Sequence, residues 1–221
     1  MVATTDRIAR VRGLLFAIAL LTLGAGCGGD DEPSATGNGE CESVEAPAPR
    51  EPGTLTAPTD SLTAGTNYGL LFETSCGSFT VGLDTELAPK TAASLVALAR
   101  EGFYDDTIFH RIVPGFVIQG GDPMQTGSGG PGYKTTDAPP AGSKYVKGVV
   151  AMAKTQAEAP GTSGSQFFVV TGADVGLPAD YAIVGEVTEG LDTVERIGAL
   201  GGPDERPTQP VVISSVTVSE S

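Results

Sequence analysis

The chain has 221 residues, of which 40% are hydrophobic, and its 13 basic and 27 acidic residues give a formal net charge of −14. This length allows one or two domains with a substantial core. Such an excess of negative charge repels the phosphate backbone of nucleic acids, and the sequence has no basic run that could dock on anionic lipid. Composition therefore argues against a nucleic-acid partner.

The first 27 residues have the pattern of an export signal. Arg7, Arg10 and Arg12 precede an apolar run over residues 14–23, which has the length of a signal core and is too short to span a bilayer as a helix. Small residues then lead into Cys27, which resembles a bacterial lipobox, although Gly24 stands where leucine is usual. We expect a lipidated Cys27 at the outer face of the membrane or, alternatively, a plain secretory signal.

Residues 28–65 are rich in Pro, Gly, Ser, Thr and acidic residues and show no apolar period. Such a segment buries too little surface to offset its ordering entropy. We expect a disordered linker, followed by one folded domain over residues 66–221.

The chain has three cysteines. If Cys27 carries lipid, Cys41 and Cys76 are left in an oxidising compartment, where they could form a disulfide. The alternative is two free thiols.

The domain begins with two strand-like segments, 68–74 and 78–84, which predict a hairpin. A helix is predicted from Pro89 to just before Gly102, because apolar residues recur there at helical spacing, and a second helix over residues 190–200. Further strands are predicted at 107–112, 117–120, 148–153, 166–171, 183–187 and 211–219. Many short strands with two helices indicate a mainly β domain with a closed antiparallel sheet.

The segment FHRIVPGFVIQGGDP, residues 109–123, holds the chain's one histidine and an arginine within an apolar run. A guanidinium is costly to bury without a task, since ions leave water reluctantly. The segment is therefore a candidate site.

Together with GSGGPGY at 127–133, VAMA at 150–153, GTSGSQFFVVTG at 161–172 and VGEVTEGLDTVERI at 184–197, this segment resembles the cyclophilin family of peptidyl-prolyl cis-trans isomerases. The resemblance covers about residues 66–219. It implies a closed eight-stranded antiparallel β-barrel capped by two helices, with a groove for proline-containing peptides on its outer face. It also implies prolyl isomerase activity on exported, folding proteins.

The resemblance assigns roles by position. It implies that Arg111 is catalytic with Gln119 as a polar groove residue, and that the peptide is bound by Phe116, Val117, Ala153, Lys154, Phe168, Leu177 and Tyr181. Lys154 stands where the family usually has asparagine, and the segment 154–159 is about three residues longer than the common pattern.

Rotation about a peptide bond needs no general base, nucleophile or metal, and the sequence shows no paired metal-ligand spacing, so we expect no cofactor. Two other functions stay open. One is a non-catalytic chaperone or adaptor that grips proline segments. The other is a hydrolase built on His110, Asp122 and Ser165, which the absence of a GxSxG elbow disfavours.

Overall fold

The computed structural model describes residues 40–221, which belong to one compact unit, Gly37–Ser221. The expected signal segment 1–27, the lipidation site Cys27 and the start of the expected linker lie outside the described residues. Within residues 40–221, neither helix has the length and apolar character needed to cross a bilayer.

The predicted hairpin is present as β1 (Tyr68–Thr74) and β2 (Gly77–Leu83). Alternate side chains of both strands point into the core, and Phe72 of β1 stands opposite Phe79 of β2 with ring centroids 4.8 Å apart. Period-two burial of apolar residues on one face is what holds these two strands in register.

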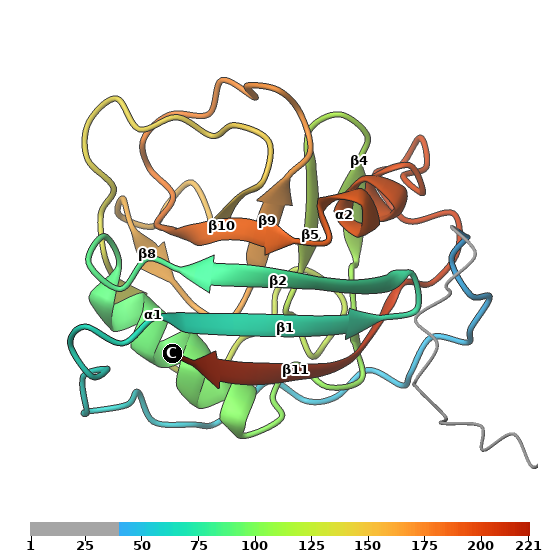
Figure 1. Cartoon of the computed structure of the whole chain (residues 1–221). Coiled ribbons are helices and arrows are strands. Elements are labelled where there is room, and N and C mark those ends of the chain that lie inside the picture. The colour runs from blue at the N-terminus through green and yellow to red at the C-terminus, as the bar shows by residue number, and fades with distance from the viewer. Residues whose placement is uncertain (1–39) are drawn as a thin grey trace, which may run out of the picture. The chain divides into compact units, whose positions relative to one another are not determined.

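The hairpin is part of an antiparallel sheet of nine strands, in the order β3-β11-β1-β2-β10-β7-β9-β5-β4 (Figure 1). The other strands are β3 (Thr107–Ile108), β4 (Arg111–Val113), β5 (Val117–Gly120), β7 (Val149–Met152), β9 (Phe167–Val170), β10 (Ile183–Glu189) and β11 (Val212–Glu220). Two short strands that the sequence did not suggest, β6 (Thr135–Thr136) and β8 (Thr162–Ser163), pair separately.

The sheet differs from the expected closed eight-stranded barrel. It has nine strands, and in the described residues no ladder joins its edge strands β3 and β4. The predicted single strand 107–112 is divided, because Phe109 and His110 carry the chain from one edge of the sheet to the other. The sheet is therefore strongly curled, and its two edges are connected by the backbone rather than by hydrogen bonds.

Two helices lie at opposite ends of the curled sheet (Figure 1). Helix α1 (Pro89–Arg100) packs on β11 and β6, and α2 (Leu191–Gly198) packs on β2, β5 and β4. Pro89 opens α1, where a missing N–H costs no helical bond. The buried faces of both helices join the core inside the sheet, which confirms the two predicted helices.

Residues 41–55 differ from the expected disordered linker. They contain no helix or strand, but the N–H groups of Glu42, Arg50, Gly53 and Leu55 each donate to a backbone carbonyl of the folded domain. We call this segment the strap. Four backbone hydrogen bonds and one from Arg50 Nη2 to the Phe103 carbonyl hold the strap, and such polar contacts leave no apolar period in the sequence.

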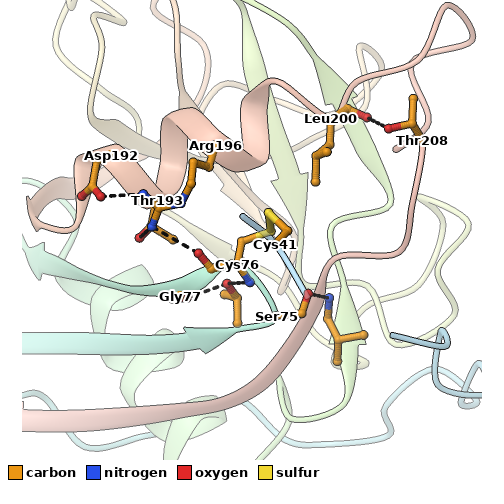
Figure 2. Close-up of a disulfide and its surroundings, with 11 residues drawn as sticks. Cys41, Ser75, Cys76, Gly77, Asp192, Thr193, Arg196, Leu200 and Thr208 are labelled. Atoms are coloured by element: carbon orange, nitrogen blue, oxygen red, sulfur yellow. Dashed lines mark hydrogen bonds and ion pairs between the residues drawn. A yellow bond between two sulfur atoms is a disulfide. The ribbon is translucent and has the colours of Figure 1, made fainter. Parts of the chain in front are cut away.

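A disulfide between Cys41 and Cys76 fixes the start of the strap to the turn between β1 and β2 (Figure 2). Arg196 of α2 donates from Nη2 to the Cys76 carbonyl over 3.2 Å and to Thr193 Oγ1 over 2.7 Å. The disulfide therefore lies where strap, hairpin and α2 meet. Of the two alternatives that the sequence left open, the structure has the paired one.

Candidate active site

The site begins with a row of residues across three neighbouring strands. Arg111 of β4 is opposite Gln119 of β5, and Gln119 is opposite Phe168 of β9. Residues opposite each other in antiparallel strands project from the same face of the sheet. The adjacent row, Ile112, Ile118 and Val169, fills the interior, so Arg111, Gln119 and Phe168 face outward.

A second apolar cluster covers the outer face around this row. Val117, Tyr145, Ala151, Phe168 and Val170 are buried there. The cluster explains why β5 and β9 read as nearly continuous apolar runs, since both of their faces are covered.

A cavity of about 300 Å³ opens beside this cluster, and all nine side chains predicted for the site line it. They are Arg111, Phe116, Val117, Gln119, Ala153, Lys154, Phe168, Leu177 and Tyr181. The floor is aromatic and aliphatic and the rim is polar, as expected of a pocket for a small apolar ring that is part of a polar chain.

A turn positions Phe116. Pro114 and Gly115 occupy its centre, Gly115 has a φ of +69°, and the Phe116 N–H donates to the Val113 carbonyl over 3.0 Å. Proline followed by a glycine at positive φ is the sequence of a type II turn. The tight turn brings Phe116 back over the start of β5.

Tyr145, which the sequence analysis missed, positions Tyr181. Its hydroxyl donates to the Tyr181 carbonyl over 2.7 Å and accepts from the Tyr181 N–H over 3.1 Å. The Tyr181 ring packs edge-on against Phe168, with centroids 5.6 Å apart. Burial raises the pKa of Tyr145, so the phenol stays protonated and able to donate.

The guanidinium of Arg111 is held from one side. Its Nε donates to Glu205 Oε2 over 2.7 Å, and its Cζ lies 6.0 Å from the centre of the Phe116 ring. Within residues 40–221 the two Nη groups donate to no protein acceptor. Four strong N–H donors are therefore available for a ligand.

Gln119 is oriented by a chain of amides. Its Nε2 donates to Gln166 Oε1 over 3.1 Å, and Gln166 Nε2 donates to the Gly129 carbonyl over 2.9 Å. Within the described part of the chain no group donates to the Gln119 side-chain oxygen, which is therefore able to accept from a ligand. Glu205 and Tyr145 act on residues far away in the sequence, and no local pattern marked them. Gln166 lies in the string 161–172, but the sequence gave no sign of its contact with Gln119.

The hydrolase alternative finds no support in the geometry. Neither ring nitrogen of His110 has a hydrogen-bond partner in the described residues, and burial lowers the pKa of its imidazole. The Ser165 hydroxyl donates to the Gly121 carbonyl over 2.7 Å, and the Asp122 carboxylate accepts from the backbone N–H groups of Met124, Thr126, Gly127 and Ser128. The three side chains therefore form no catalytic relay.

A larger cavity of about 590 Å³ lies on the other side of Arg111 and Gln119, which line both cavities. Its other walls come from Ile108, His110, residues 125–127, the loop 204–210 and Ala46 of the strap. In residues 40–221, no cluster of three or more His, Cys, Asp or Glu side chains is placed to hold a metal ion.

Comparison with protein families gives a match over residues 70–218 to the model described as cyclophilin type peptidyl-prolyl cis-trans isomerase/CLD. Among curated proteins, a peptidyl-prolyl cis-trans isomerase-like 1 of Gibberella zeae is 40% identical over 156 residues, covering 68% of this chain and 94% of the relative. Peptidyl-prolyl cis-trans isomerase A of Mycobacterium tuberculosis is 42% identical over 166 residues, covering 66% of this chain and 89% of the relative.

Among solved structures, a cyclophilin type peptidyl-prolyl cis-trans isomerase of Cryptosporidium parvum superposes with a TM-score of 0.64 at 30% identity. The match covers 70% of this chain and 99% of that chain. A second crystal structure of the Cryptosporidium protein, determined in the presence of the dipeptide Ala-Pro, superposes with a TM-score of 0.63 at 30% identity, covering 69% of this chain and 99% of that chain.

Proposed function

The chain belongs to the family of cyclophilin-type peptidyl-prolyl cis-trans isomerases, and we propose that it is an exported, lipid-anchored member that acts on Xaa-Pro bonds of proteins folding outside the cytoplasmic membrane. The signal-like segment 1–27 and the lipobox-like sequence before Cys27 support export. The Cys41–Cys76 disulfide suits an oxidising compartment.

The reaction is a rotation with no covalent step. Turning an Xaa-Pro bond out of plane breaks amide conjugation against a barrier of about 18 to 20 kcal/mol. In the twisted state the prolyl nitrogen is pyramidal and regains a lone pair. A donor held beside that nitrogen therefore stabilises the twisted state more than either planar state.

The observation that carries the proposal is the position of Arg111 at the rim of the smaller cavity, where its Nη groups have no acceptor among residues 40–221. Glu205 holds the guanidinium by Nε, and this arrangement presents the Nη donors to a ligand. Arginine stays protonated throughout the physiological range, so the donor is always present. We assign to it the hydrogen bond to the prolyl nitrogen.

The other lining residues confine the rotation to one bond. Phe116, Val117, Phe168 and Leu177 provide the apolar surface for the prolyl ring. The main chain at Ala153 and Lys154 lies along the neighbouring wall, where we place the residue that precedes proline. When the prolyl ring is held on one side of the Xaa-Pro bond and the preceding carbonyl on the other, the bound peptide lies close to the twisted geometry.

Replacing Arg111 with alanine tests the assignment. A charge-assisted hydrogen bond contributes about 1.5 to 3 kcal/mol, so turnover of a short Xaa-Pro peptide should fall about ten- to a hundredfold. Peptide affinity, measured by titration calorimetry, should change much less. Arg100→Ala, which removes an arginine from the exposed end of α1, is the matched control.

Two outcomes would count against this assignment. Turnover of Arg111→Ala equal to that of Arg100→Ala would remove the arginine from the mechanism. Binding of proline peptides by the unaltered protein without any acceleration of their isomerisation would favour the non-catalytic chaperone or adaptor.

Export and anchoring need a separate measurement. Mass spectrometry of the mature protein should find a lipid-modified Cys27 at the N-terminus, and Cys27→Ser should release the protein from the membrane fraction. An unmodified mature chain beginning near residue 27 would instead indicate a plain secretory signal.

A further inference from the structure

The cavity that we assign to proline has an unusual charge balance for so acidic a chain. Two cations, Arg111 and Lys154, line it, and none of its nine lining residues is acidic. Arg111 is paired with Glu205 just outside the cavity. Lys154 makes no ion pair with any residue in 40–221, so the wall at Lys154 carries an uncompensated positive charge.

The ammonium group of Lys154 is fixed in place by neutral partners. Its Nζ donates to the carbonyls of Glu158 over 3.1 Å and Thr155 over 3.3 Å, and it lies 5.4 Å from the centre of the Tyr181 ring. An ammonium has three donors, and two are used. One N–H and the full charge therefore stay available at the edge of the cavity.

The carboxylate in the same loop does not neutralise this charge. Glu158 Oε1 pairs with Lys134 over 2.9 Å, and Oε2 accepts from the backbone N–H of Thr155 over 2.7 Å. Hydrogen bonding from the Thr155 backbone, followed by Lys134, holds the pKa of Glu158 below its usual value, against the effect of burial. The side-chain carboxylate of Glu158 is thus ionised but turned toward Lys134, whereas its main-chain carbonyl faces Lys154.

From this arrangement we propose that the enzyme prefers an acidic residue, Asp or Glu, immediately before the proline. The inference rests on the proposed function, which places that residue along the wall formed by Ala153 and Lys154. The net charge of −14 does not prevent the preference, because charges beyond about 8 Å are largely screened at physiological salt. Lys154 and Arg111 are the charged residues that line the cavity, while the carboxylates of Glu158 and Glu205 lie behind them and pair with Lys134 and with Arg111 Nε.

The test uses three peptides that are identical except for Glu, Gln or Lys before the proline. Isomerisation of each is measured with the full-length protein at physiological salt, and the uncatalysed rate is subtracted. One partly exposed ion pair should make kcat/KM about two- to fivefold higher for Glu-Pro than for Gln-Pro. The ratio should approach one at about 1 M salt, where the screening length is about 3 Å.

Variants assign the preference to one side chain. Lys154→Gln should abolish the ratio between Glu-Pro and Gln-Pro, and Lys154→Glu should make Lys-Pro the best of the three. Lys90→Gln changes the net charge equally on the exposed side of α1, and it should keep the ratio of the unaltered protein.

Equal acceleration of all three peptides, or a ratio that survives in Lys154→Gln, would overturn this inference and leave the isomerase intact. Absence of acceleration for every peptide would overturn the proposed function and the inference together. The salt dependence requires no substitution, so it tests the inference even if a variant fails to fold.

Discussion

At the scale of single residues, the site depends on one ion pair that the sequence did not reveal. Glu205 has a φ of +63°, which is uncommon for a residue other than glycine. Its carbonyl accepts from the Ile112 N–H over 2.7 Å while its carboxylate holds Arg111 Nε. Backbone and side chain of Glu205 thus fix β4 and its arginine together, which makes Glu205 a positioning residue.

Replacing Glu205 with glutamine should lower kcat about three- to tenfold, the equivalent of about 0.7 to 1.4 kcal/mol in the barrier, because Arg111 then samples more rotamers. KM should stay close to that of the unaltered protein, since Glu205 does not line the smaller cavity. Asp204→Asn removes the same charge from the neighbouring residue and is the control. If kcat falls equally in both variants, the effect comes from the charge of the loop and not from the positioning of Arg111 by Glu205.

The residues of the cavity could be predicted because they lie in strings that are recognisable along the chain. The strings around Arg111, Phe116 and Phe168 supply both identity and spacing. Glu205 contacts Arg111 across 94 positions, and Gln166 contacts Gln119 across 47. Such partners are set by the tertiary fold, and no local period encodes them.

At the scale of elements, the loop after β5 is organised around the buried side chain of Asp122. Its carboxylate accepts from the N–H groups of Met124, Thr126, Gly127 and Ser128 at 2.6 to 3.1 Å. Burial acts to raise the pKa of Asp122, but the backbone donors outweigh it and lower the pKa from its ordinary value. The ionised carboxylate therefore stabilises the folded loop.

Asp122→Asn should lower the free energy of unfolding at pH 7 by about 2 kcal/mol, because an amide accepts these bonds more weakly. A folded-state pKa below that of the unfolded chain means that the stabilisation is full above the unfolded pKa and is lost as the pH falls through the folded pKa. The difference in the free energy of unfolding between the unaltered protein and Asp122→Asn, measured by urea titration, should thus become smaller from pH 5 toward pH 3. A difference that does not change with pH would contradict the stabilising role of the ionised Asp122 carboxylate.

Elements with a clear apolar period agreed best with expectation. The hairpin β1–β2 and helices α1 and α2 lie within two residues of their predicted bounds. The prediction of one strand over residues 107–112 was wrong. Phe109 is buried where the chain passes between the two edges of the sheet, and its apolar side chain continued the strand-like pattern. Strands β6 and β8 have two residues each, too few for any period to show.

The strap depends on the Cys41–Cys76 disulfide, which joins residues 35 positions apart. A bridge closing a loop of this length contributes about 3 to 4 kcal/mol in the chain-entropy model. Cys41→Ser should therefore lower the urea midpoint and make the strap a substrate for proteases. The unaltered protein in reductant is the matched comparison, and equal stability with and without reductant would refute this contribution.

At the scale of the whole molecule, the described residues bring no titrating pair to the reacting bond. The one histidine is kept neutral by burial, which lowers the pKa of its imidazole. The donor that we assign to catalysis is the guanidinium of Arg111, which has N–H donors and no acceptor. The fold thus supplies a fixed charge and a fixed cavity rather than a proton relay.

The rate should accordingly be nearly independent of pH. We expect kcat/KM on an uncharged Xaa-Pro peptide to vary by less than about twofold between pH 6.5 and pH 8, after subtraction of the uncatalysed rate at each pH. A bell-shaped profile would show that a general acid or base takes part and would reopen a role for His110.

The bond between Cys41 and Cys76 also spans the exposed stretch from Thr59 to Gly65. A protease that cuts the backbone once in that stretch leaves two polypeptides still joined through sulfur. Electrophoresis of the nicked protein should show one band without reductant and two with it. The lipid anchor that we propose at Cys27 would then stay attached to the catalytic domain, and release through a cut in this stretch would require reduction of the disulfide as well.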